Sequence, residues 1–156
     1  MAVNTASGCQ LYVGTTTEAD SLSEFEADTY TLIGEITNMG EFGRQYALIT
    51  HSSLDDRNVR KFKGQRDDGT MALIVGSDAQ DAGQAILFDA LDDDQDYNFK
   101  VIENDDSDTS GAEGTTSYFR GKIMSARKVI GDASNVVTRR IDLALQSGTL
   151  IDVPAT

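Results

Sequence analysis

Apolar and polar residues alternate with a period of two along most of the chain, which is typical of β-strands with one buried face. The alternation is clearest late in the chain, at Ile141, Leu143 and Leu145. Residues 71–75 are apolar at every position, which favours a central strand. Residues 117–130 are long enough for one extended strand or two. The pattern predicts strands near residues 9–13, 30–37, 46–50, 71–75, 97–101, 117–130 and 140–146.

One segment has helical spacing instead. Ser77 and Gln80 have the spacing of a capping box, in which each side chain bonds a backbone N–H at the start of a helix. Small and apolar residues follow at intervals of three and four, although Gly83 costs about 1 kcal/mol of helix propensity. The segment therefore predicts one helix from about Asp78 to Leu91, laid against a sheet.

Three polar stretches predict loops: residues 15–28, 50–69 and 103–114. The strands and the single helix together predict a mainly β fold, an antiparallel sandwich or barrel with one flanking helix (about 78–91) and a long loop (about 50–69). A length of 156 residues suits one domain, 1–156, with extended N- and C-terminal segments. The start of the chain does not resemble a signal peptide, and no apolar run is long enough to span a bilayer, so we expect synthesis in the cytoplasm.

The charge is strongly and unevenly negative. Asp and Glu number 26 against 13 Lys and Arg, for a net charge of −13, which argues against a surface that grips nucleic acid. Such a charge either keeps a soluble protein apart from its neighbours or repels a polyanion. Residues 1–43 contain no Lys or Arg, whereas five of the 13 lie in residues 57–66. This basic cluster is read as a solvated loop, a nucleic-acid patch or, preferably, a contact with acidic surface on a neighbouring copy.

Residue types that support catalysis are scarce. The single His, His51, lies in a polar stretch, and the single Cys, Cys9, lies in a strand pattern where it suits a small core residue. The chain has no nucleophile elbow, Walker loop or dinucleotide-binding fingerprint. We therefore expect no enzymatic activity and no cofactor.

Two acidic stretches imitate parts of a calcium loop. Asp92, Asp94 and Asp96 have the right spacing, with Glu103 at the twelfth position, but Tyr97 stands where the turn needs glycine. A second stretch, residues 106–117, has the glycine but ends in serine where glutamate is needed. Solvated acidic loops explain both, so no metal site is predicted.

Five segments, in order, resemble the tail-tube proteins of long-tailed bacteriophages. Residues 9–14 (CQLYVG) and 30–37 (YTLIGEIT) with 39–43 (MGEFG) are similar to the family's "LYxG" and "IGEVT" strands. Residues 53–69 are similar to its "LDD…G-x-x-D-x-G" loop, 81–87 to the start of its helix, and 118–126 (YFRGKIMSA) to its late strand. The basic residues Arg60 and Lys61 stand where many members carry acidic or neutral ones.

The resemblance implies a structural subunit of a virion. In that family, six subunits form a ring, rings stack around a tape measure protein, and DNA passes without specific binding through an electronegative lumen. The partners it implies are further copies of the chain, the tape measure protein and a tail terminator, with no membrane binding. The residues that it implies for ring stacking lie in the long loop: Leu54, Asp55, Asp56, Arg57, Arg60, Lys61, Phe62, Lys63, Gly64, Arg66 and Asp67.

Strand alternation adds an expectation about the lumen. If Ile141, Leu143 and Leu145 face the core, Asp142 faces outward. If Leu32 and Ile36 also face the core, Glu35 faces outward too. We expect Glu35 and Asp142 to line the lumen, with Arg140 partly offsetting Asp142. Two other classes remain open: another ring-forming virion protein, such as a tail terminator or head–tail joining protein, and a small enzyme or binding domain.

Overall fold

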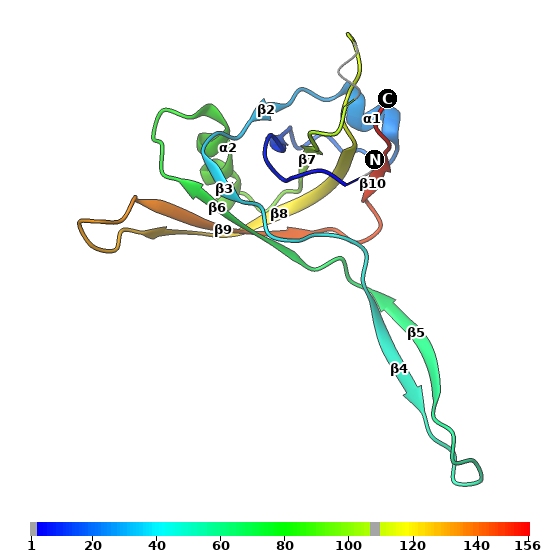
Figure 1. The fold of residues 1–156 in the computed structure, drawn as a ribbon. Helices are drawn as coiled ribbons and strands as arrows, with labels where there is room; N and C mark the ends of the chain where they lie inside the picture. The colour runs from blue at the N-terminus through cyan, green and yellow to red at the C-terminus, as the bar shows by residue number, and fades with distance from the viewer. Residues whose placement is uncertain (1–2, 107–109) are drawn as a thin grey trace.

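A computed structural model describes residues 3–106 and 110–156, in which the chain forms ten strands and two α-helices (Figure 1). The helices are α1 (Leu22–Ala27) and α2 (Ala82–Leu91). The strands are β1 (Gln10–Val13), β2 (Thr31–Leu32), β3 (Ile36–Asn38), β4 (Tyr46–His51), β5 (Arg60–Arg66), β6 (Thr70–Gly76), β7 (Tyr97–Ile102), β8 (Thr116–Val129), β9 (Thr138–Leu145) and β10 (Ile151–Val153).

The main sheet is antiparallel and curled. Its strands follow the order β2-β1-β7-β8-β9-β6-β3, and β10 pairs with the first residues of β8. The outermost strands, β2 and β3, are separated in the chain only by residues 33–35. A link of that length spans at most about 14 Å, so the two ends of the sheet must lie close together. The predicted mainly β fold with a flanking helix is confirmed.

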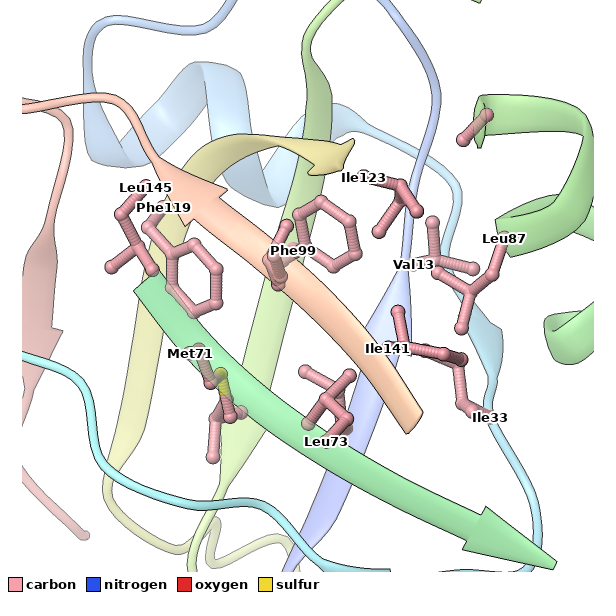
Figure 2. Packing of buried hydrophobic residues seen from close by; sticks show 14 of the residues in the cluster. Val13, Ile33, Met71, Leu73, Leu87, Phe99, Phe119, Ile123, Ile141 and Leu145 are labelled. Carbon is pink, nitrogen blue, oxygen red and sulfur yellow. The ribbon is translucent and has the colours of Figure 1, made fainter. Parts of the chain in front are cut away.

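The core fills the inside of the curl (Figure 2). Burial in β9 alternates as predicted, burial in β6 alternates too, and Phe99 of β7 stacks on Phe119 of β8 with 5.6 Å between ring centroids. Leu87 and Ala90 of α2 are buried and pack against this core. The strands contribute these buried hydrophobic residues to this core: Leu11, Val13, Met71, Leu73, Val75, Phe99, Val101, Phe119, Ile123, Ile141, Leu143 and Leu145.

Helix α2 begins later than predicted, at Ala82 rather than about Asp78, and the capping box at Ser77 and Gln80 is wrong. The cap is Asp81, whose Oδ2 accepts from the backbone N–H of Gln84 (2.9 Å) and of Gly34 (3.1 Å). One carboxylate thus starts the helix and fastens it to the link between β2 and β3. Gly83 allows this contact, because a Cβ there would lie 2.3 Å from the Leu32 carbonyl oxygen.

The strand predicted at residues 30–37 is two short strands. Ile33 is buried and Leu32 is exposed, the reverse of the face assignment made from alternation. Glu35 has a φ of 60°, a left-handed conformation that breaks the strand. The chain turns here to pass from the β1 end of the sheet to the β6 end.

The predicted loop at residues 15–28 contains α1, which covers the outer face of β7 and of the start of β8. Phe25 is buried and stacks on Tyr118 with 5.6 Å between centroids. Asn98, fully buried, donates from Nδ2 to the Thr17 carbonyl (2.8 Å) and to Asp28 Oδ2 (2.7 Å). Its Oδ1 accepts from Arg120 Nε (3.1 Å). This network pins the α1 segment to the sheet.

The long loop predicted at about 50–69 is wrong in extent, since β4 and β5 pair through most of it as a ribbon and only residues 52–59 connect them. The stretch predicted at 117–130 forms one strand, β8 (Thr116–Val129). Strand β6 has neighbours on both sides as predicted, but its Ala72 is exposed, so only one of its faces is covered. Neither helix in the described ranges has the length and apolar character needed to cross a membrane.

The ribbon is fastened to the body by one ion pair. Arg66 donates from Nε and Nη2 to the two carboxylate oxygens of Asp68, both at 2.7 Å. Asp68 is buried, and its backbone N–H donates to Ser147 Oγ (3.1 Å). The hydrogen bonds from Arg66 hold the pKa of the Asp68 carboxyl below its usual value, against the effect of burial. The same bonds raise the pKa of Arg66.

Replacing Asn98 by Ala should lower the free energy of unfolding by about 1–3 kcal/mol, because Asp28 and Arg120 then lose a partner at a buried position. Chemical denaturation of the wild type and the variant measures the change. Gln95→Ala, at an exposed residue just outside β7, is the control and should be neutral. Equal losses in both variants would contradict the role given to the network.

Replacing Asp68 by Asn should lower the melting temperature at neutral pH. Because the folded state lowers the pKa of Asp68, its contribution is complete above the ordinary value of 3.8 and is lost as the pH falls through the lowered pKa. The difference in melting temperature between wild type and variant should therefore shrink below pH 3.8. A difference independent of pH would show that ionised Asp68 does not stabilise the fold.

Candidate functional site

The β4–β5 ribbon, Tyr46–Arg66, projects from the body as an arm (Figure 1). The two strands pair from Tyr46 opposite Arg66 to His51 opposite Arg60, with an irregularity between Tyr46 and Leu48. All six residues of β4 are exposed. A two-stranded ribbon is at best marginally stable alone in water, so this arm suits a segment that is completed by another surface.

Apolar side chains of the arm lie in solvent. Leu48 is 66% exposed, Phe62 is 53% exposed, and Leu54 at the tip is fully exposed. Ile49 and Val59 are also exposed. A group of large apolar side chains on one projecting element marks a contact surface.

The arm is basic while the body is acidic. It carries five basic and two acidic residues, a net charge of +3, whereas the rest of the chain has eight basic and 24 acidic residues, a net charge of −16. Arg60 Nη2 lies 3.8 Å from Asp56 Oδ2 in an exposed ion pair, and Lys63 Nζ lies 5.2 Å from the centre of the Tyr46 ring. Arg57 and Lys61 make no ion pair with any described residue. The arm is therefore complementary to the rest of the molecule.

The arm brings together the residues expected to stack rings. Residues 54–57 form the tip, where the Ser53 carbonyl accepts from Asp56 N (3.4 Å) and the Ser53 hydroxyl bonds Asp55. The others lie along β5, except Asp67, whose N–H donates to the Gln45 carbonyl at the arm's base (2.8 Å). No observation on the isolated chain tests their role in stacking, which stays a prediction.

The second candidate surface is the uncovered sheet face, meaning the outer face of β6, β9 and the second half of β8. Asp142 lies on it, exposed, and accepts a hydrogen bond from Ser125 Oγ (2.9 Å). Glu35 lies at the edge of this face. Gly76 is on the same face as Ala72, and a Cβ on Gly76 would lie 3.4 Å from the Glu35 Cβ. The fold thus places both expected lumen residues at one face, although Glu35 reaches it from a link and not from a strand.

Besides Arg140, which alternation already places here, the same face carries basic residues that alternation within single strands does not reveal. Arg127 lies directly opposite Arg140 across the β8–β9 ladder, and both are exposed. Lys122 is on this face too, and its Nζ lies 3.9 Å from Asp96 Oδ1. The register of the β8–β9 pair is shifted by a bulge between Ile123 and Ser125, and only that register places Arg127 beside Arg140. The face therefore holds both signs of charge.

The residues considered for catalysis lie apart from both candidate surfaces or in regular strands. His51 is exposed at the end of β4, and Cys9 is a free, half-buried residue before β1. Within ranges 3–106 and 110–156 there is no cluster of three or more His, Cys, Asp or Glu able to hold a metal. Of the two calcium-like stretches, residues 97–102 are strand β7, and part of the other, 107–109, lies outside the described residues.

Comparisons with known proteins identify the fold. No family model and no curated protein matches the sequence. A chain from the six-fold symmetrised baseplate of the anti-feeding prophage is 12% identical, with a TM-score of 0.68 over 99% of this chain and 98% of that chain. A chain from the sheath/tube terminator of the PVC extracellular contractile injection system is 15% identical, with a TM-score of 0.66 over 98% of both chains. The tail tube of SPP1 is 14% identical, with a TM-score of 0.62 over 93% of this chain and 77% of that chain. The chain has the fold shared by phage tail tubes and the tubes of contractile injection systems.

Proposed function

We propose that this protein is the structural subunit of a bacteriophage tail tube, which assembles into rings of six that stack into a conduit for DNA. The observation that carries the proposal is the arm, an exposed ribbon with apolar and basic side chains on an acidic body. The six-fold symmetry of the similar baseplate supports the ring number. The subunit is proposed to be non-enzymatic, like the structural proteins that it resembles in fold.

In this proposal the arm joins one ring to the next. Ile49 and Phe62, opposite one another on one face of the ribbon, and Leu54 at the tip bury their exposed surface against the neighbouring ring, and each fully buried side chain of this kind contributes about 1.5–3 kcal/mol. Arg57 and Lys61 meet acidic residues of that ring and fix the register of the contact. The proposed partners are copies of the same chain, a tape measure protein inside the tube and a terminator at its end, all within the phage tail after synthesis in the host cytoplasm.

The uncovered sheet face is proposed to line the lumen. Glu35 and Asp142 contribute negative charge there, and DNA slides past without specific contacts because fixed negative charge repels it over about 8 Å at physiological salt. The cations Arg127 and Arg140 oppose that charge unless a neighbouring subunit neutralises them. Electronegativity of the lumen therefore depends on the contacts within the ring.

A second candidate function is that of a tube terminator, favoured by the similarity to a chain of the PVC terminator structure. A terminator binds the tube on one side only, so it forms single rings. A tube subunit has stacking surfaces on both sides and forms long polymers.

Concentrated wild-type protein should form hollow tubes many rings long in negative-stain electron microscopy. Isolated rings that never stack would favour the terminator. A monomer under all conditions of concentration and salt would contradict both candidates.

Reversing charge on the arm with Arg57→Glu and Lys61→Glu should raise the subunit concentration needed for polymerisation by at least about tenfold, because attraction between rings becomes repulsion. Sedimentation of polymer measures the threshold, and raised salt should increase the wild-type threshold through the same contact. The control variant keeps both positive charges and carries Arg57→Lys and Lys61→Arg. If the reversed variant polymerises at the wild-type threshold, the arm does not join rings through its charges.

Cryo-electron microscopy of the tube should place the Asp142 and Glu35 carboxylates on the inner wall. If both lie on the outer surface, or if the inner wall is lined chiefly by Lys and Arg, the proposed lumen assignment fails.

A further inference from the structure

The end of the β8–β9 hairpin, residues 127–140 (the basic hairpin), extends from the body at the side opposite α1 (Figure 1). Four cations form two adjacent rungs of its ladder: Arg127 faces Arg140, and Lys128 faces Arg139. The only acid in these residues is Asp132, so the net charge is +3. Like charges directly opposite on paired strands destabilise a hairpin.

The free subunit does little to relieve this repulsion. None of the four cations forms an ion pair with another described residue. Arg139 lies over the Phe88 ring of α2, 4.1 Å from its centre, while its buried Nε has no hydrogen-bond partner in the described structure. Val129, Ile130, Val136 and Val137 near the turn are exposed. The basic hairpin thus combines unneutralised charge with uncovered apolar surface.

The backbone of β8 is also incomplete here. Strand β7 pairs with β8 only as far as Gly121, so the edge of residues 122–129 that faces away from β9 has no partner strand among the described residues. An open edge beside concentrated charge is a surface prepared for another chain.

Complementary charge lies at the other end of the body. Glu18, Asp20, Glu24 and Glu26, in and just before α1, are all exposed, and no Lys or Arg occurs in the first 43 residues. We call these four residues the acidic segment. In Figure 1 the segment around α1 and the basic hairpin lie at opposite ends of the body. One subunit therefore presents opposite charges on opposite sides.

We propose that the basic hairpin of one subunit docks on the acidic segment of the next copy around the ring. Two different, complementary surfaces on opposite sides give a head-to-tail contact, and such contacts close into a ring when the rotation between copies allows it. The contact supplies the cations with acidic partners. This inference rests on the proposed ring and adds to it the pair of surfaces that joins neighbours within it.

The test is a charge exchange between two variants. Variant one carries Arg127→Glu, Lys128→Glu and Arg140→Glu, which changes the net charge of the basic hairpin from +3 to −3. Variant two carries Glu18→Lys, Asp20→Lys and Glu26→Lys, which changes that of the acidic segment from −4 to +2. Glu24 is kept because it accepts a hydrogen bond from the Asp20 backbone.

Each variant alone should fail to form rings, because both of its surfaces then carry the same sign. An equimolar mixture should form rings in which the two variants alternate, and native mass spectrometry should show equal numbers of each. If the mixture does not assemble although both variants are folded, or if variant two alone assembles like the wild type, the proposed pairing is wrong. The second result would direct the search to another acidic surface.

Two further measurements separate the causes of failure. Arg127→Glu alone places opposite charges on the rung with Arg140. The melting temperature of this variant should therefore equal or exceed that of the wild type, while ring formation weakens. A lower melting temperature would contradict the repulsion within that rung. Wild-type protein in the same buffer tests the ring itself. Rings from the wild type and from both single-surface variants would overturn this inference and leave the proposed tube function intact.

Discussion

The fold depends on the short link, residues 33–35, that joins the two ends of the main sheet. With β2 on one end and β3 on the other, a flat arrangement of the intervening strands is impossible. Helix α2 fixes this geometry at its first turn, where Asp81 holds Gly34 and the buried Gln84 donates to the Gly34 and Gly76 carbonyls (3.2 and 2.9 Å). The curl, the main core inside it and the exposed face outside it all follow from that closure.

The outer face of the curled sheet is covered by α1 over β7 and the start of β8, which leaves β6, β9 and the second half of β8 open. The arm and the basic hairpin both extend beyond the core, both are cationic, and both carry exposed apolar side chains on an otherwise acidic molecule. They leave the body in different directions (Figure 1). Two such ribbons suit the two kinds of contact in the proposed tube, one within a ring and one between rings.

Most features that depend on a buried face could be predicted from the sequence, and most that depend on pairing could not; β4 is an exception, predicted as a strand although all of its residues are exposed. The alternation at Ile141, Leu143 and Leu145 is visible because one side of β9 is buried. Strand β5 is exposed on both sides, so its residues lack this alternation and indicate a loop. The cap at Asp81 is hidden because its second partner, Gly34, lies 47 residues away. The candidate site was predictable as a basic segment, but the rungs of the basic hairpin required the β8–β9 register.

The arm also separates two kinds of selection on the sequence. Every described hydrophobic residue of the core lies outside residues 46–66, so substitutions within the arm, except at Arg66 with its bond to buried Asp68, leave core packing untouched. Its length, charge and apolar pattern can therefore change over evolutionary time under the demands of the partner surface alone. Descendants of one such fold can diverge until their arms no longer fit one another's partner surfaces, while the body that carries the arm stays the same.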